Sequence, residues 1–206
     1  DPQVVAAAYA AMTDAEFDAI NGRQDWANWR TIPRALSAHL PNRPLTVADL
    51  GCGTGSSTRV LAFYCPPGSR ITGYELVPVL VDVARRRPYV HRSGSPCSVE
   101  FVCQGVTEPL RRLDQTLVPD GSLDLVNASG VVGHHLNADT VRPLVAELQR
   151  TLRADGVAML DVGPTLRDAD LTRVMTTAGF VRLGRWRSWW LDPTGEVVFR
   201  RCASAS

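Results

Sequence analysis

The sequence predicts an α/β fold with a doubly wound, mostly parallel sheet of seven strands and an antiparallel hairpin at the C-terminal end. Three observations support this fold class. Short apolar runs alternate with helical patterns, a glycine-rich turn follows the first run, and a turn sequence separates the last two runs. Alternating strands and helices imply right-handed βαβ units, which build an open parallel sheet with helices on both faces.

The expected elements follow from hydrophobic periodicity along the chain. Residues 1–44 are expected to be helical, with a second helical segment from Trp26 to Leu40 that ends before Pro41. The apolar runs predict strands at 45–50, 70–75, 99–103, 123–129, 156–163, 180–191 and 196–201. Helical patterns between them predict helices at 56–64, 78–87, 139–153 and 166–178.

Two turn signals set boundaries in the second half of the chain. Asn137 or Asp139 can cap the start of the 139–153 helix, and Gly156 stands where a C-terminal cap is expected. The run Asp-Pro-Thr-Gly at 192–195 predicts the turn of the final hairpin.

The composition is that of an ordinary globular chain. Of 206 residues, 45% are hydrophobic and 21% are charged, and the formal net charge of +1 gives no electrostatic reason for a nucleic-acid or acidic-membrane partner. No apolar run approaches the ~18 residues that a membrane span needs. Five cysteines without a C-x-x-C pair favour reduced thiols over disulfides or zinc. We therefore expect one domain over residues 1–206, soluble and cytoplasmic, without a metal.

The strongest functional signal is the segment 49–55, Asp-Leu-Gly-Cys-Gly-Thr-Gly, at the first strand-to-helix turn. Glycines there let the backbone turn tightly and approach a ligand, next to free amides at the helix start. Glu75 ends the second expected strand about twenty residues later, where an acidic side chain can accept both hydroxyls of a ribose. The glycine spacing here is G-x-G-x-G, and Ser56 stands where the nicotinamide-binding fingerprint has its third glycine. A dinucleotide-binding oxidoreductase is therefore only an alternative hypothesis.

Taken together, these motifs resemble the class I S-adenosylmethionine-dependent methyltransferases. Segment 47–55 is similar to the first motif of that family, 73–78 to its acidic second motif, and 123–136, which ends in His-His-Leu, to its fourth strand and following loop. The resemblance implies a Rossmann-like methyltransferase fold. It also implies a cofactor-binding core at 45–203 and a helical lid or substrate segment at 1–44.

The resemblance also implies a set of cofactor contacts. It places Gly51 and Gly53 against the methionine part of S-adenosylmethionine, Asp49 near the cofactor's amino group, and Glu75 on the ribose. The remaining implied contacts are Cys52, Leu76, Gly105, Val106 and Ser129.

The adenine contact departs from the family pattern. Val106 stands where relatives often carry an aspartate that accepts a hydrogen bond from the adenine amine. Backbone amides, Gln104 or Thr107 are therefore the alternatives for adenine recognition.

Two adjacent histidines, His134 and His135, follow the fourth expected strand near the expected position of the methyl group. A histidine with a pKa near neutral can remove a proton from the acceptor as the methyl is transferred. The alternative is that one ring only packs or caps the next helix. Metal binding has little support because the segment 127–130, Asn-Ala-Ser-Gly, lacks the carboxylates that metal-dependent relatives place there.

The N-terminal segment is rich in aromatic residues: Tyr9, Phe17, Trp26 and Trp29. They can form a lid over the cofactor, with Arg30 or Arg34 reaching its carboxylate, or they can bury the N-terminal helices against the sheet.

The sequence thus predicts a metal-independent methyltransferase that uses S-adenosylmethionine and acts on a small molecule. Oxygen is the expected acceptor atom, with nitrogen and carbon as alternatives. A non-catalytic cofactor-binding homologue or partner subunit, and an NAD(P)-binding oxidoreductase, are the competing hypotheses. The expected partner is a small-molecule acceptor, with neither nucleic acid nor a membrane.

Overall fold

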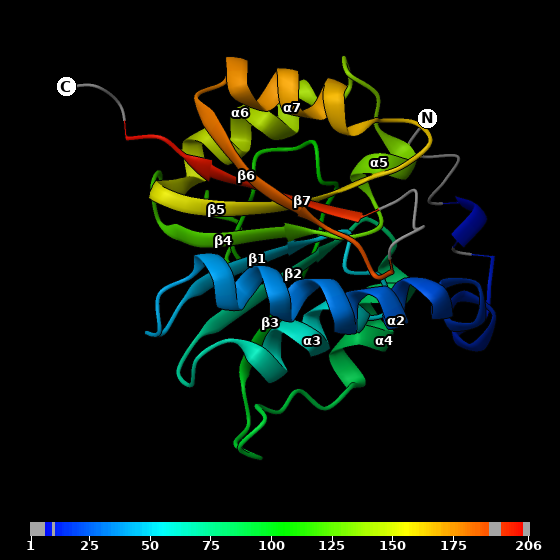
Figure 1. The fold of residues 1–206 in the computed structure, drawn as a ribbon. Coiled ribbons are helices and arrows are strands. Elements are labelled where there is room, and N and C mark those ends of the chain that lie inside the picture. The colour runs from blue at the N-terminus through cyan, green and yellow to red at the C-terminus, as the bar shows by residue number, and fades with distance from the viewer. Residues whose placement is uncertain (1–6, 10, 190–194, 204–206) are drawn as a thin grey trace.

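The computed structural model describes residues 7–9, 11–189 and 195–203 and is built around one seven-stranded sheet of order β3-β2-β1-β4-β5-β7-β6 (Figure 1). The strands are β1 (Thr46–Leu50), β2 (Arg70–Glu75), β3 (Ser98–Cys103), β4 (Leu123–Ala128), β5 (Leu152–Val162), β6 (Phe180–Trp186) and β7 (Gly195–Arg201). Strands β1 to β5 pair in parallel, and β7 runs antiparallel to both β5 and β6. The predicted α/β class, the seven strands and the antiparallel C-terminal strands are confirmed.

Helices cover both faces of the sheet, which gives three layers (Figure 1). They are α2 (Asp14–His39), α3 (Ser56–Tyr64), α4 (Pro78–Arg86), α5 (Val132–His135), α6 (Arg142–Thr151) and α7 (Asp168–Thr177). Helices α2, α3 and α4 lie on one face, and α5, α6 and α7 lie on the other (Figure 1). Parallel strands that are buried on both faces are expected to be apolar throughout, and all six residues of β4 are buried.

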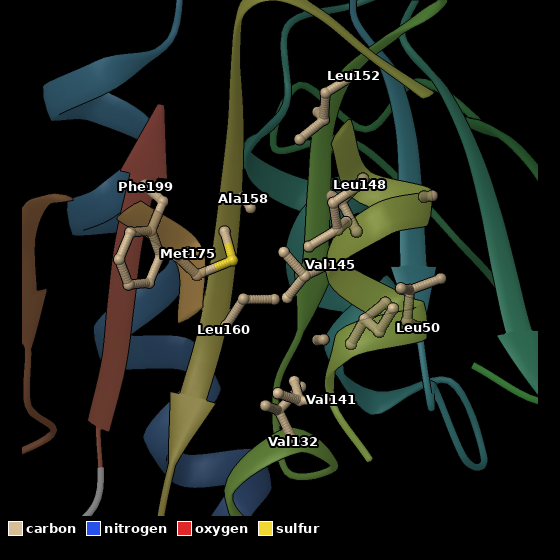
Figure 2. Close-up of a cluster of buried hydrophobic side chains, with 14 of the residues drawn as sticks. Leu50, Val132, Val141, Val145, Leu148, Leu152, Ala158, Leu160, Met175 and Phe199 are labelled. Atoms are coloured by element: carbon tan, nitrogen blue, oxygen red, sulfur yellow. The ribbon is translucent and has the colours of Figure 1, made fainter. Parts of the chain in front are cut away.

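The apolar core is divided by the sheet into two main clusters. The larger one lies under α6 and α7, where Val145 of α6 and Leu160 of β5 point toward each other (Figure 2). The other lies under α2 and α3 and includes Ile32, Leu61 and Met159. The apolar residues of α6 that recur at helical spacing, Leu144, Val145 and Leu148, are all buried in the larger cluster.

The N-terminal segment contains one long helix rather than a break before Trp26. Helix α2 begins after Thr13, whose hydroxyl accepts from the Glu16 N–H while the Glu16 carboxylate accepts from the Thr13 N–H, a capping box. Pro33 lies inside the helix, which continues to His39. The expectation of a separate segment starting at Trp26 was therefore wrong, because the capping signal at Thr13 and not the later aromatic residues sets the start.

The boundary between α6 and β5 also differs from the expectation. The helix ends at Thr151, and the strand begins at the next residue, so Gly156 lies inside β5 and caps no helix. The β4–β5 register shifts between the pairs Leu123–Leu152 and Leu125–Val157, and Asp155 takes the positive φ of 64° that a glycine would be expected to take. A bulge in the strand was thus mistaken for a helix end.

The final hairpin and the loop after β4 show two further differences. Strand β6 ends at Trp186 instead of 191, and the predicted turn at 192–195 falls, apart from Gly195, outside the described residues. The short helix α5 was not predicted, because four residues are too few to show a period.

We predict that Leu148→Ala lowers the free energy of unfolding by about 2–5 kcal/mol, because Leu148 is fully buried between α6 and the sheet and truncation leaves a cavity. Leu113→Ala is the matched control, since the Leu113 side chain is 52% exposed and its removal should change stability by no more than about 0.5 kcal/mol. Urea unfolding followed by circular dichroism measures both; equal losses would contradict the assignment of Leu148 to the core.

Candidate functional site

A cavity of about 1120 Å³ opens at the carboxyl ends of the parallel strands. It lies where β1 pairs with β2 on one side and β4 on the other, the point at which the chain reverses its direction across the sheet. Open α/β sheets bind their ligands at this topological switch point. The lining includes all but two of the predicted site residues: Gly51, Cys52, Gly53, Glu75, Leu76, Gly105, Val106, Ser129 and His135.

The glycine turn after β1 forms the floor of the cavity and requires glycine at two positions. Gly51 has a φ of +66°, and a Cβ on it would lie 2.9 Å from the Val131 Cβ. Gly53 has a φ of +54°, and a Cβ there would lie 3.0 Å from the ring of Phe17. Both positions combine a left-handed backbone with a close approach, so no other residue fits without strain.

Glu75 joins the end of β2 to the glycine turn. Its Oε2 accepts from the Gly53 N–H at 3.0 Å, and its Oε1 accepts from the Val77 N–H at 2.9 Å. Burial raises the pKa of this carboxyl, and the backbone donors oppose that shift. Each oxygen retains a lone pair, so the carboxylate can accept hydrogen bonds from two ligand hydroxyls.

Asp49 lies beneath the glycine turn and is not part of the cavity lining. It is fully buried and accepts from Ser57 Oγ at 2.7 Å, Thr58 Oγ1 at 2.5 Å and Asn127 Nδ2 at 2.7 Å. Burial raises its pKa, while these three donors favour the ionised form. These hydrogen bonds connect β1 with β4 and α3, and the contact of Asp49 with a cofactor amino group stays a prediction.

Cys52 lines the cavity as a small buried side chain. Burial raises the pKa of its thiol well above the ordinary value, so the thiol stays protonated at neutral pH. This agrees with its interpretation as an apolar filler rather than a nucleophile.

The segment after β3 forms the side of the cavity that faces Leu76. Gln104 does not line it: its Nε2 donates to the Pro109 carbonyl at 3.0 Å, and its Oε1 accepts from the Arg111 N–H at 3.1 Å. Thr107 and Glu108 do line it. The Glu108 carboxylate, which the sequence interpretation missed, bends back so that its Oε1 is 2.8 Å from where a Cβ on Gly105 would be.

The two histidines take different positions. His135 lines the cavity and contacts the edge of Tyr9, with ring centroids 6.3 Å apart. Burial, and then the nearby His134, lower the pKa of His135, so its neutral form predominates at pH 7. His134 does not line the cavity. The geometry thus separates two residues that the sequence could not distinguish.

Helix α2 closes the cavity with polar side chains that the sequence interpretation missed. Asp18 accepts from Thr54 Oγ1 at 2.7 Å and forms an ion pair with Arg87, so it connects α2 to the glycine turn and to the end of α4. Asp25 pairs with Arg59 of α3 at 3.2 Å. The lining residues of α2 that share its inner face are Asp18, Asn21, Asp25 and Asn28. Because residues three or four apart lie on the same side of a helix, this spacing could have identified the polar face from the sequence.

The aromatic residues of the N-terminal segment divide into two groups. Tyr9 and Phe17 line the cavity and contact each other edge to face, with centroids 5.3 Å apart. Trp29 instead packs against Phe63 and Tyr64 in the core, and Trp26 is 45% exposed. Packing is therefore the observed role of Trp29, and the lid over the cofactor stays a prediction for Tyr9 and Phe17.

The arginines expected at the cofactor carboxylate lie elsewhere. Arg30 stacks over the Trp26 ring at 4.5 Å, and Arg34 donates to the Arg187 carbonyl at 3.4 Å. Neither lines the cavity, whereas Arg59 and Arg87 do.

Within the described residues, no cluster of three or more His, Cys, Asp or Glu side chains has the arrangement of a metal site. In the same part of the chain, no helix combines the length and apolar character that crossing a membrane requires.

Comparison with known proteins agrees with this geometry. Residues 47–156 match the methyltransferase domain family. The malonyl-[acyl-carrier protein] O-methyltransferase of Serratia marcescens is 30% identical over 111 residues, which are 54% of this chain and 35% of that enzyme. The chain thus spans about a third of the length of this curated relative.

Two solved structures share the fold. A TehB-like SAM-dependent methyltransferase from Corynebacterium glutamicum has a TM-score of 0.58 at 23% identity, covering 82% of this chain and 86% of that one. The 1,6-didemethyltoxoflavin-N1-methyltransferase of Burkholderia thailandensis, with bound 1,6-didemethyltoxoflavin and S-adenosylhomocysteine, has a TM-score of 0.64 at 23% identity, covering 98% and 91%. Because the family match includes the glycine turn, Glu75 and the segment after β4, this chain belongs to the methyltransferase domain family, the class I S-adenosylmethionine-dependent methyltransferases.

Proposed function

We propose that this chain transfers the methyl group of S-adenosylmethionine to a hydroxyl oxygen of a small molecule, without a metal ion. The observation that carries the proposal is the cavity at the switch point of the sheet, in which the glycine turn and the buried carboxylate of Glu75 lie side by side. A cavity of about 1120 Å³ exceeds the usual ~300–1,000 Å³ of a single small-ligand site, so it has room for cofactor and acceptor together.

The residues present fit the cofactor. The positive φ angles of Gly51 and Gly53 leave space that a Cβ would fill, which suits the amino-acid part. Glu75 would hold the ribose hydroxyls, and Leu76 and Val106 would contact the adenine. When bound, S-adenosylmethionine supplies an activated methyl group, so the protein's task is to align the acceptor and exclude water. The residues assigned to the cofactor are Asp49, Gly51, Cys52, Gly53, Glu75, Leu76, Gly105, Val106 and Ser129.

His135 is the residue that we assign as general base. Its ring lines the cavity next to Tyr9, and its lowered pKa keeps it neutral and able to accept a proton from a hydroxyl at pH 7. The oxygen acceptor is supported by the similarity to an O-methyltransferase. The fold neighbour from Burkholderia thailandensis is by its name an N1-methyltransferase, so nitrogen is the second candidate acceptor atom.

Helix α2 and the residues before it act as the lid in this proposal. The contacts of Asp18 with Thr54 and Arg87, and of Asp25 with Arg59, hold α2 across the cavity. We further propose that residues 1–44 form this lid on a core of 45–203 within one domain. The acceptor would lie between the lid and His135.

We predict that S-adenosylhomocysteine, but neither NAD nor NADP, raises the melting temperature. At one hundred times the dissociation constant the shift should be about 5–10 °C. Methyl-labelled cofactor with a panel of phenols, carboxylic acids and ring N–H compounds then tests transfer. Binding without transfer to any acceptor would favour the non-catalytic homologue, and a shift with a nicotinamide alone would overturn the proposal.

We predict that Glu75→Gln weakens the affinity for S-adenosylhomocysteine by about 10- to 100-fold, because the amide cannot replace the carboxylate as acceptor for both the Gly53 N–H and a ribose hydroxyl. Isothermal titration calorimetry measures the change. Glu100→Gln on β3, at an exposed position, is the control with the same chemical substitution. Unchanged affinity in a folded Glu75→Gln protein would remove Glu75 from the cofactor site.

We predict that His135→Gln lowers kcat about 10²- to 10⁴-fold with little change in cofactor affinity, whereas His134→Gln retains most of kcat. The rate of the wild type should fall as the pH drops through the lowered pKa of His135, below its ordinary value of about 6.5, because protonation removes the base. Initial rates from pH 5 to 8 test this; a larger loss in His134→Gln would reverse the assignment.

A further inference from the structure

A buried carboxyl group that the proposed mechanism does not use lies on β7, beside β5 in the sheet. Glu196, the second residue of β7, is only 2% exposed, and its Oε2 has no hydrogen-bond partner among the described residues. Its register partner on β5 is Asp161, which is also buried. Two neighbouring buried carboxyl groups rarely both ionise, because neither charge is solvated and each repels the other.

The surroundings decide which of the two carries the negative charge. Asp161 accepts hydrogen bonds from three backbone N–H groups, those of Val131, Val132 and Gly133, at 2.8–3.0 Å. Burial raises the pKa of Asp161, whereas the nearby His134 and these three backbone donors oppose that shift. Glu196 has no comparable set of donors. Asp161 is therefore the ionised partner, and it fixes the backbone of the segment that leads to His135.

The charged groups that act on Glu196 among the described residues are acidic. They are Asp161 on β5 and Asp49 on β1, whose negative charges oppose its ionisation. On β6, Arg185 packs near Gly195 but pairs with Asp168. Burial is the main reason that the pKa of Glu196 is raised well above its ordinary value, and the two acidic neighbours raise it further.

The direction of the hydrogen bonds points the same way. Asn127 Nδ2 donates to Asp49, which fixes the orientation of the Asn127 amide and leaves its Oδ1 as an acceptor. Ser129 Oγ donates its single proton to that Oδ1 at 3.0 Å. Ser129 is also within side-chain hydrogen-bonding reach of Glu196, and a donation from Ser129 would lower the pKa of Glu196. Because the hydroxyl proton is already used, Ser129 can only accept from Glu196.

We propose that Glu196 is a positioning residue which, as a neutral carboxylic acid, donates a hydrogen bond to Ser129 and completes a buried chain of donors that runs Glu196→Ser129→Asn127→Asp49. This chain crosses from β7 through β4 to β1 under the cavity and orients the Ser129 hydroxyl. The part of the inference that concerns the cofactor, which is expected above Ser129, rests on the proposed function. The protonation of Glu196 does not.

The pH dependence of folding tests the protonation directly. An unfolded glutamate loses its proton near pH 4.3, whereas Glu196 would keep it in the folded protein. In this pH range the folded state then binds more protons than the unfolded state. The wild type therefore loses stability as the pH rises from about 4.3 to the raised pKa of Glu196 in the folded protein. Glu196→Gln removes this loss. We therefore expect the folding equilibrium constant of Glu196→Gln, divided by that of the wild type, to rise by up to about tenfold for each pH unit.

Urea unfolding from pH 4.5 to 8 gives this ratio without any ligand. Glu100→Gln is the matched control, because Glu100 is exposed and its substitution should leave the ratio independent of pH. A ratio for Glu196→Gln that is equally flat would show that Glu196 is ionised in the folded protein and would overturn the proposal.

A second pair of measurements tests the positioning role. In a double-mutant cycle, Glu196→Leu and Ser129→Ala each remove the same hydrogen bond, so their effects on stability should not add. Glu196→Leu should weaken S-adenosylhomocysteine binding about 3- to 10-fold, and Glu196→Gln, which can still donate to Ser129, should restore it. Additive effects in the cycle would contradict the bond. If the wild type binds no S-adenosylhomocysteine, the proposed function fails, while the pH series and the cycle still decide the state and role of Glu196.

Discussion

The buried carboxylate of Asp49 is the constraint on which the site depends. A charge at the end of a buried strand is tolerated only where donors surround it, and here they come from two other elements, Asn127 on β4 and Ser57 and Thr58 on α3. Because these bonds join β1, β4 and the start of α3, they set the direction in which the chain leaves the sheet after Leu50. The glycine turn and the cavity above it follow from that direction. Asp49, the acidic residue of the motif, therefore acts through these hydrogen bonds on the frame of the site.

The same edge of the sheet gathers further acidic groups, each held in a different way. Glu75 is fixed by backbone N–H groups of the glycine turn and of Val77, and Asp161 by three N–H groups of the segment at the start of α5. Both carboxylates thus hold loops that line the cavity, and these hydrogen bonds all come from backbone N–H groups. Backbone donors suit this task because they position a carboxylate without adding a positive charge to the site. An edge rich in carboxyl groups favours a ligand that carries positive charge, as a sulfonium and an ammonium group do.

Helix α2 is the element that turns an open crevice into a cavity. Its N-terminal half lies over the glycine turn, where Phe17 fills the space that a side chain on Gly53 would take. Its C-terminal half, with Ile32 and Leu36, is buried in the core on the same face of the sheet. The helix therefore combines a firmly packed end with an end held by the polar contacts of Asp18 and Asp25, which are partly exposed and so weaker. In the proposed function, this polar end of α2 opens over the site while the packed end stays in the core.

The sequence by itself determined the fold class, the approximate strand positions and part of the cavity lining, because apolar periodicity and a glycine-rich turn are local signals. It pointed to Glu75 because residues at the carboxyl ends of neighbouring parallel strands meet at one edge of the sheet. It pointed to Ser129 through the family resemblance of segment 123–136. It misplaced the end of α6, where the bulge near Asp155 depends on pairing with β4. Only the tertiary structure separated His135 from His134, assigned Asp18 and Asp25 to the cavity, and brought Glu196 to Asp161. Each of these depends on contacts between elements distant in the chain, whose relative rotation no local pattern specifies.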